Sequence, residues 1–202
     1  MIRKNIKKLR EYGELTDLGS LSRRYFVIGT FDGALTILAL VIGAYAGSVA
    51  HVQEPELIEK LGQVIFTTGL AMGIGLGISS FFGAYESERI ERRIELKKLE
   101  KQMLTKMKGT IYDDAAKFAV LWSSFVHGIS PMIAAWIPII PFLIMDVHRA
   151  IIVSITISLF ILFATGMYLG KVAKRSMMMS GLRFLVIGII TAIICQFAGV
   201  VH

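Results

Sequence analysis

Residues 26–47 of the chain read FVIGTFDGALTILALVIGAYAG, and Asp32 is the one charged residue among them. A helix of about 20 predominantly apolar residues is long enough to cross the roughly 30 Å hydrocarbon core of a membrane. Four further stretches have a similar apolar character, at residues 61–85, 115–144, 150–170 and 184–201. We therefore predict an all-α integral membrane protein with five transmembrane helices and no separate soluble domain.

The chain is expected to form one membrane domain with a charged helical extension. The second apolar stretch continues without a helix breaker into ESERIERRIELKKLEKQ, so its helix should extend beyond the membrane. The third stretch is too short for two crossings, and its prolines at 131, 138 and 141 should kink or break its helix. The predicted parts are a basic segment at 1–25, helices 1 and 2 at 26–85, a charged cytoplasmic helix at 86–114, and helices 3 to 5 at 115–202.

The distribution of basic residues predicts the orientation. A net charge of +7 would suggest nucleic acid as the partner of a soluble protein, but in a membrane protein the position of the charges matters more. Twenty of the 22 Lys and Arg residues lie at 1–25, 86–117 and 171–183, and the other two are Lys60 and Arg149. By the positive-inside rule, the N-terminus and the extension are cytoplasmic and the C-terminus is outside. We expect a multi-pass protein, in the cell membrane if the source is prokaryotic, that binds no nucleic acid.

Asp32 is the single acidic residue within the five apolar stretches. A charged side chain at the centre of a bilayer costs at least about 2.5–3.5 kcal/mol on insertion scales, so such residues usually face a pathway or a partner. Gly29 and Gly33 would let another helix or an ion approach the backbone closely. We interpret Asp32 as a functional acid; the alternative is a structural carboxylate neutralised by Arg23 or Arg24.

The second apolar stretch contains GLAMGIGLGISS at residues 69–80, with Met72 as a soft side chain. Its glycines allow tight helix packing, and Met72 alone would be an ordinary packing residue. A thioether that faced an intramembrane carboxylate would instead form a mixed site suited to a borderline transition metal. Both interpretations of Met72 remain open from the sequence.

Three glutamates of the predicted extension, Glu88, Glu91 and Glu95, fall within one stripe about 60° wide on a helix. Like charges at this spacing repel one another unless a cation neutralises them. Carboxylates that project from helices at such spacing bind metal ions in ferritin-like bundles. The alternative is a solvated face on which Glu88 pairs with Arg92 and Glu95 with Lys98.

The remaining candidates are weaker. His127 lies in the third apolar stretch, where a packing histidine is favoured over a ligand, and Cys195 is interpreted as a small buried hydrophobic residue. The sequence contains no GxSxG, HExxH, CxxC or phosphate-loop motif, so we expect no enzyme and no cofactor. Any transport would then depend on ion or proton gradients.

These motifs together resemble the vacuolar iron transporter family. VIGTFDGALTILALVIGAYAG, at residues 27–47, matches the family's G-x-x-DG-x(6)-L-x-x-G pattern. AMGIGLGISS is similar to its S-M-x-x-GEY-x-S segment, and ESERIERRIE is similar to the glutamate-rich helix that follows. The last stretch, GLRFLVIGIITAIICQFAGVV, also resembles the family, so the resemblance covers nearly the whole chain.

The resemblance implies a five-helix homodimer that exports Fe²⁺, and often Mn²⁺, from the cytosol in exchange for protons. The metal would pass between protomers, beside Asp32 and Met72, after Glu88, Glu91 and Glu95 had collected it at the cytoplasmic mouth. The implied partners are therefore divalent metal ions, protons, the bilayer and a second copy of the chain.

The chain departs from the family pattern in two places. Leu76 stands where the pattern has the glutamate of GEY, which removes one intramembrane carboxylate. The region between the second and third helices is also shorter than in the family, although Asp113 and Asp114 could supply carboxylates there or cap the third helix. Two alternatives therefore stay open: a membrane-anchored metal-binding or sensor protein without transport, and a transporter of the same fold with a non-metal substrate.

Overall fold

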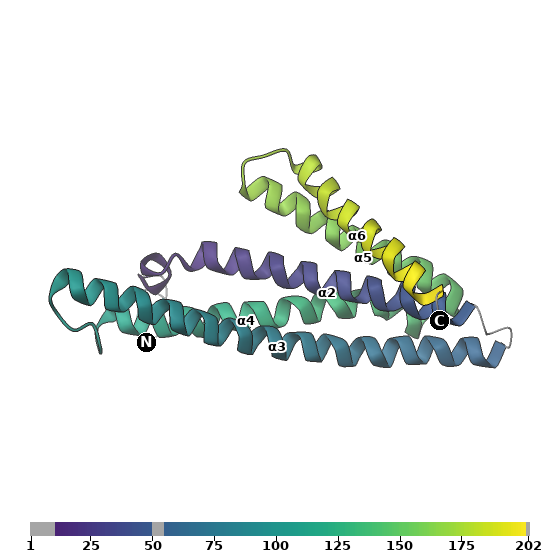
Figure 1. Ribbon diagram of the computed structural model, residues 1–202, viewed down its shortest axis with the longest axis horizontal. Helices are drawn as coiled ribbons and strands as arrows, with labels where there is room; N and C mark the ends of the chain where they lie inside the picture. The colour runs from purple at the N-terminus through teal and green to yellow at the C-terminus, as the bar shows by residue number, and fades with distance from the viewer. Residues whose placement is uncertain (1–10, 50–54, 201–202) are drawn as a thin grey trace.

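The computed structural model describes residues 11–49 and 55–200 of the chain, and within them it contains helices and turns but no strand. Residues 1–10 of the predicted basic segment lie outside this part. Five long helices account for most of it (Figure 1): α2 (Leu18–Val49), α3 (Pro55–Met103), α4 (Ile111–Ile139), α5 (Val147–Val172) and α6 (Met177–Val200). Each is long and apolar enough to cross a membrane. The predicted all-α membrane fold is thus confirmed.

Helix α3 contains both the second apolar stretch and its charged extension. Its 49 residues span about 70 Å at 1.5 Å per residue, more than twice the hydrocarbon thickness of a bilayer. The helix ends at Met103, and Leu104 follows with a φ of 52°. Gly109, with a φ of 79°, adopts the left-handed conformation that glycine tolerates best, just before α4 begins. The second membrane helix therefore does extend beyond the apolar region.

Helix α4 passes through two of its three prolines as a single helix. Pro131 and Pro138 both lie inside it, and it ends at Ile139, where the short 3₁₀ helix η1 (Ile140–Leu143) begins. Pro141 lies in the first turn of η1, where its missing N–H costs no helical hydrogen bond. The third apolar stretch is therefore one helix, and its break falls at the last proline.

Helix α4 packs against both α2 and α3 through glycine positions (Figure 1). A Cβ atom placed on Gly33 of α2 would lie 2.9 Å from the Cα atom of Pro131. A Cβ atom on Gly77 of α3 would lie 2.9 Å from the carbonyl oxygen of Gly128. No side chain fits at either contact without a shift of the helices, so these glycines determine how close α2 and α3 come to α4.

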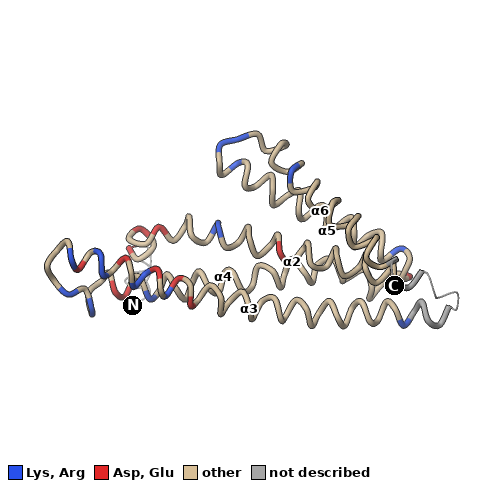
Figure 2. The backbone as a smooth tube through the Cα atoms, in the orientation of Figure 1, with Lys and Arg blue, Asp and Glu red and all other residues tan. Residues whose placement is uncertain are grey.

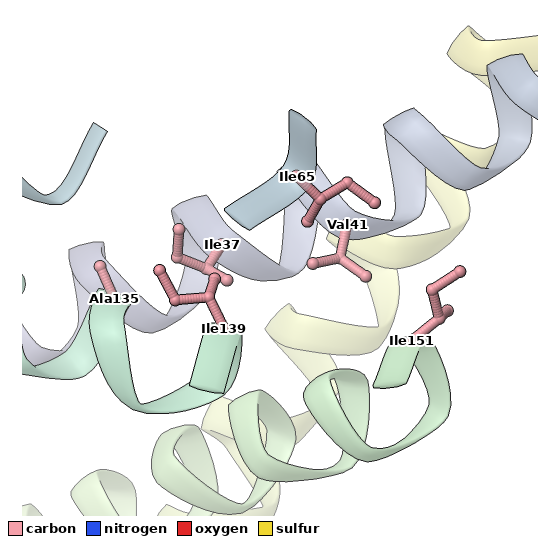
Figure 3. Close-up of a cluster of buried hydrophobic side chains, with 6 residues drawn as sticks. All are labelled: Ile37, Val41, Ile65, Ala135, Ile139 and Ile151. Carbon is pink, nitrogen blue, oxygen red and sulfur yellow. The ribbon is translucent and has the colours of Figure 1, made fainter. Parts of the chain in front are cut away.

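Toward the end of the bundle where α4 ends and α5 begins, the core is aliphatic. Figure 3 shows a cluster to which four helices contribute: Ile37 and Val41 of α2, Ile65 of α3, Ala135 and Ile139 of α4, and Ile151 of α5. Helices α5 and α6 pack against each other and against α2, and Figure 1 shows this hairpin diverging from α2 toward the turn at residues 173–176.

We call the opposite end of the bundle the charged end; it comprises residues 11–25, 86–117 and 171–183. Most of the charged residues gather there, whereas the middle of the bundle is largely free of charge (Figure 2). Helix α6 begins at Met177, seven residues before the apolar stretch predicted at 184, so Arg183 is part of this helix. The charged residues of this end border the apolar region of the bundle, so an ion or ligand that approaches from this side meets them first.

Candidate functional site

Asp32 lies near the middle of α2 and is half-buried. Its neighbours Gly29 and Gly33 face α4 at close range, so the carboxylate lies beside the contact between α2 and α4. Arg24, one of the two cations that could have neutralised Asp32, is bonded to another carboxylate instead. The role of Asp32 as a functional acid stays a prediction.

His127 connects α4 to α2. Its Nδ1 atom lies 3.2 Å from the backbone carbonyl oxygen of Tyr25, and the two rings are 4.8 Å apart. Because a carbonyl oxygen only accepts hydrogen bonds, Nδ1 carries the proton in this contact. The contact is the one expected of a packing histidine, and it fixes the orientation of the imidazole against Tyr25.

Met72 lies on α3 and is half-buried. Two of the glycines around it face α4: a Cβ atom on Gly69 would lie 2.9 Å from a side-chain carbon of Ile139, and Gly73 lies against Trp136. Among the described residues, no group of three or more His, Cys, Asp or Glu side chains could hold a metal ion. The pairing of Met72 with Asp32 stays a prediction.

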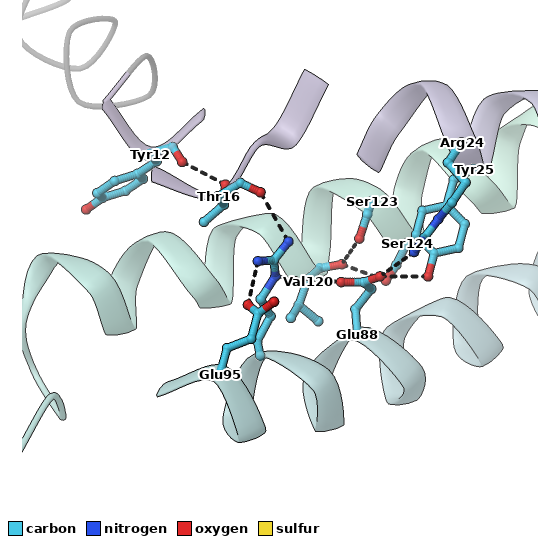
Figure 4. Close-up of polar contacts among 10 residues, drawn as sticks. Tyr12, Thr16, Arg24, Tyr25, Glu88, Glu95, Val120, Ser123 and Ser124 are labelled. Atoms are coloured by element: carbon cyan, nitrogen blue, oxygen red, sulfur yellow. Dashed lines mark hydrogen bonds and ion pairs between the residues drawn. The ribbon is translucent and has the colours of Figure 1, made fainter. Parts of the chain in front are cut away.

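Glu88 is buried at the charged end, with 4% of its surface exposed. The hydroxyl group of Tyr25 donates a hydrogen bond of 2.9 Å to Oε1 of Glu88, and Nη2 of Arg24 donates another of 3.2 Å to the same oxygen (Figure 4). The Nε atom of Arg92 lies 3.7 Å from Oε2. One carboxylate thus joins the start of α2 to the extension of α3, with two guanidinium groups to balance its charge.

Arg92 continues this network along the extension. Its Nη1 donates a hydrogen bond of 2.7 Å to Glu95, and its Nη2 donates one of 3.2 Å to the backbone carbonyl oxygen of Thr16 (Figure 4). Glu91 is exposed. The pair Glu88–Arg92, one of the alternatives considered for the stripe, is therefore present, whereas Glu95 pairs with Arg92 rather than with Lys98.

The three glutamates of the stripe consequently have different surroundings. Glu88 already accepts hydrogen bonds from a phenol and a guanidinium, so it could ligate a metal only if this network opened. Glu91 and Glu95 are exposed and could meet ions in solvent. Asp113 accepts hydrogen bonds from Lys117 and from the backbone N–H of Gly109. The bond from Gly109 connects the first turn of α4 to the turn that precedes it.

The network around Glu88 contains contacts that the sequence did not indicate. Tyr25 and Glu88 are 63 residues apart, and neither belongs to a spacing motif that links them. The sequence offers one weak indication of this network: a tyrosine and two arginines lie at the border between a basic segment and an apolar one.

The chain is similar in sequence to a known protein family and to an archaeal protein. A family model described as "VIT family" matches residues 103–200, which include α4, α5 and α6. An uncharacterized protein of Methanocaldococcus jannaschii is 32% identical over 181 residues, and the alignment covers 88% of each chain. The likeness to this archaeal protein therefore extends well beyond the region that the family model matches.

Proposed function

We propose that this chain, which belongs to the VIT family of membrane transporters, moves Fe²⁺ or Mn²⁺ out of the cytosol in exchange for protons. Family membership and five apolar helices make the chain a multi-pass integral membrane protein. The choice of metal, the coupling to protons and the direction are our inference.

The proposal rests on the position of Asp32, a lone carboxylate within an apolar helix. Asp32 lies six residues into the apolar stretch that begins at residue 26, about 9 Å along the axis of α2, and glycines bring α4 close on the adjacent face. A carboxylate at this depth is stable either as the neutral acid or with a cation beside it. Metal and proton would therefore compete for Asp32, and a site that must hold one or the other exchanges them across the membrane.

A second copy of the chain would complete the metal site. One carboxylate supplies two oxygen atoms at most, whereas Fe²⁺ and Mn²⁺ commonly take about six ligands. The described part of one chain gathers no group of three ligating carboxylate, imidazole or thiolate side chains. We therefore propose a homodimer in which Asp32 and Met72 of both protomers line the path, with bound water in the remaining positions.

The charged end would be the cytoplasmic entrance. Glu91 and Glu95 are exposed there and could attract cations, while Glu88 holds the entrance together through Tyr25 and Arg24. Most Lys and Arg residues of the chain lie at this end, in agreement with the positive-inside rule.

Transport into proteoliposomes tests the proposal. Purified protein would be reconstituted with an imposed pH gradient, and uptake of Fe²⁺, Mn²⁺, Zn²⁺ and Ca²⁺ would be followed separately. We expect uptake of Fe²⁺ or Mn²⁺ that requires the gradient and is accompanied by proton movement in the opposite direction. Metal binding without flux would instead identify a membrane-anchored sensor.

One observation favours a second candidate, a transporter of this fold with a non-metal substrate. Leu76, where the family pattern has a glutamate, is a half-buried residue of α3, so an oxygen ligand is missing from the middle of that helix. In the same proteoliposomes, absence of flux for all four metals in a correctly folded preparation would favour this candidate.

A further inference from the structure

A cavity of about 550 Å³ lies at the charged end between the extension of α3 and the start of α4. Six charged side chains contribute to its lining, and five of them are basic: Arg89, Arg92, Arg93, Lys108 and Lys117, with Asp113 as the acid. The cavity is separate from Asp32 and Met72.

Helical periodicity explains why these basic groups converge. Arg89, Arg92 and Arg93 are three and four residues apart on α3, so they share one face of that helix. Lys117 follows Asp113 by four residues on α4 and thus shares its face. Lys108 comes from the turn between the two helices, next to the left-handed Gly109.

The acidic groups nearby do not neutralise all of these cations. Arg89 pairs with Glu86, and Lys117 pairs with Asp113. Arg92 lies against two glutamates, yet its Nε atom is buried and donates no hydrogen bond.

Two cations of the lining are left over. In the described part of the chain, Arg93 and Lys108 form no ion pair. Lys108 does help, after the backbone N–H of Gly109 and Lys117, to lower the pKa of the Asp113 carboxyl, but Asp113 already pairs with Lys117, so a lining of five basic groups and one acid keeps an excess of positive charge.

The cavity lies where the protein leaves the apolar layer. The apolar part of α3 ends at Tyr85, which is part of the lining, and charged residues follow it directly. Tyr112 in the first turn of α4 and Trp122, ten residues further along the helix, are exposed on either side of the residues that line the cavity. Exposed Tyr and Trp residues mark the headgroup level of a membrane, so the cavity should open at the depth of the lipid phosphates.

We propose that this cavity binds a phosphate group, which joins the extension of α3 to the start of α4. A guanidinium group presents paired donors that match phosphate oxygens, and lysines supply further positive charge. Basic pockets between membrane helices are suited to anionic headgroups. The phosphate could come from an anionic phospholipid or from a soluble phosphate compound; both would be held by Arg93 and Lys108.

The test compares two charge-matched double variants of the full chain in detergent. Arg93→Gln with Lys108→Gln removes the two cations of the cavity that form no ion pair. Lys171→Gln with Arg175→Gln removes the same two residue types from exposed positions in the last turn of α5 and in the turn that follows it. Gel filtration and thermal melting establish that each variant is folded.

Two probes distinguish the sources of phosphate. Native mass spectrometry measures retention of phosphatidylglycerol against phosphatidylcholine, and thermal melting in lipid-free detergent measures stabilisation by inorganic pyrophosphate. Each cation near a headgroup contributes about a fivefold factor, so the cavity variant should lose about tenfold to thirtyfold in affinity. The control should bind like the wild type. Selective loss of phosphatidylglycerol identifies a lipid, and selective loss of pyrophosphate stabilisation identifies a soluble ligand.

Three results would overturn the proposal. The first is that neither probe distinguishes the wild type from the cavity variant. The second is an equal loss in both variants, which would show non-specific attraction to charge. The third is loss of dimers in the cavity variant with unchanged binding of both probes, because the cavity would then receive an acidic side chain of a second copy.

Discussion

At the scale of single residues, Asp32 carries the proposed transport. The variant Asp32→Asn keeps the size of the side chain but removes the charge that would compensate a dication in a low dielectric. We expect metal flux to fall to the level of empty liposomes. Elution and melting temperature should stay near those of the wild type, because the structure gives this carboxylate no ion pair to lose among the described residues. Wild-type flux in this variant would remove Asp32 from the mechanism.

Glu88 should matter for stability instead. Replacing it with Gln leaves Arg92, whose side chain is 16% exposed, without its buried counter-charge and weakens the hydrogen bonds from Tyr25 and Arg24. Hydrogen bonds to charged groups contribute about 1.5–3 kcal/mol, which corresponds to a fall in melting temperature of about 3–12 °C for a chain of this size.

Glu91→Gln is the matched control for Glu88→Gln. Glu91 lies on the same helix as Glu88 but is exposed. The melting temperature of the Glu91→Gln protein in detergent should therefore stay close to that of the wild type. Equal melting temperatures for the two variants would mean that the network around Glu88 contributes little to the fold.

At the scale of the helices, the contact between α2 and α4 depends on the absence of a side chain at Gly33. A methyl group there would press on the backbone of Pro131, so Gly33→Ala should destabilise the protein by about 1–3 kcal/mol. Gly43 lies on the same helix with nothing within 4 Å of its Cβ position, so Gly43→Ala should be neutral or slightly stabilising. Thermal melting of the two variants in the same detergent measures the difference. A Gly33→Ala protein as stable as Gly43→Ala would show that α2 and α4 are not tightly fixed.

The glutamate stripe can be tested with Glu88 kept in place, although Glu95 also pairs with Arg92, which contacts Glu88. Replacing Glu91 and Glu95 by Gln should raise the metal concentration for half-maximal transport at least about twofold, because the entrance loses negative charge. Maximal flux should remain, since Asp32 is intact. The difference should shrink at high ionic strength, where exposed charges are screened. Unchanged half-saturation at low salt would identify the stripe as a solvated face.

The helices could be predicted well because each depends on a local property. An apolar stretch of 20 residues has few alternatives to a membrane helix, and the extension of α3 follows from the lack of any breaker after Tyr85. Helix α6 begins before the apolar stretch predicted at 184, because Arg183 interrupts the apolar pattern but not the helix. A long basic side chain near a helix end can extend toward water, so it does not end the helix.

The candidate site could be predicted only in part. Asp32 was identifiable as a lone acid in an apolar sequence, without knowledge of its neighbours. The partners of Glu88 were not, because Tyr25 and Arg24 meet it through tertiary contact over more than 60 residues. A helical stripe indicates which residues share a face, but it does not say which of them another helix will bury. Burial therefore separated Glu88 from Glu91, although both had the same expected role.

At the scale of the whole molecule, the two ends of the bundle are held in different ways. Aliphatic side chains of four helices pack at the end where α4 stops, whereas hydrogen bonds and ion pairs join α2, α3 and their neighbours at the charged end (Figures 3 and 4). Polar contacts can exchange with water or with ions, while a packed aliphatic cluster cannot. We therefore expect the change that admits ions from the cytosol to occur at the charged end, and their release on the other side to require a separate opening.

The orientation of the whole molecule in the membrane decides the direction of transport, and it can be measured directly. Single cysteines would be placed in a background in which Cys195, the one native cysteine, is replaced by Ala. Met145 lies exposed in the turn before α5, at the end away from the charged residues, and Lys98 lies exposed on the extension of α3. With 20 of 22 basic residues on one side, a membrane-impermeant maleimide added to intact cells should label Met145→Cys and leave Lys98→Cys unlabelled. In inverted vesicles the pattern should reverse, which shows that both cysteines are reactive. Labelling of Lys98→Cys in intact cells would place the charged end outside, and the proposed export would then have to be import.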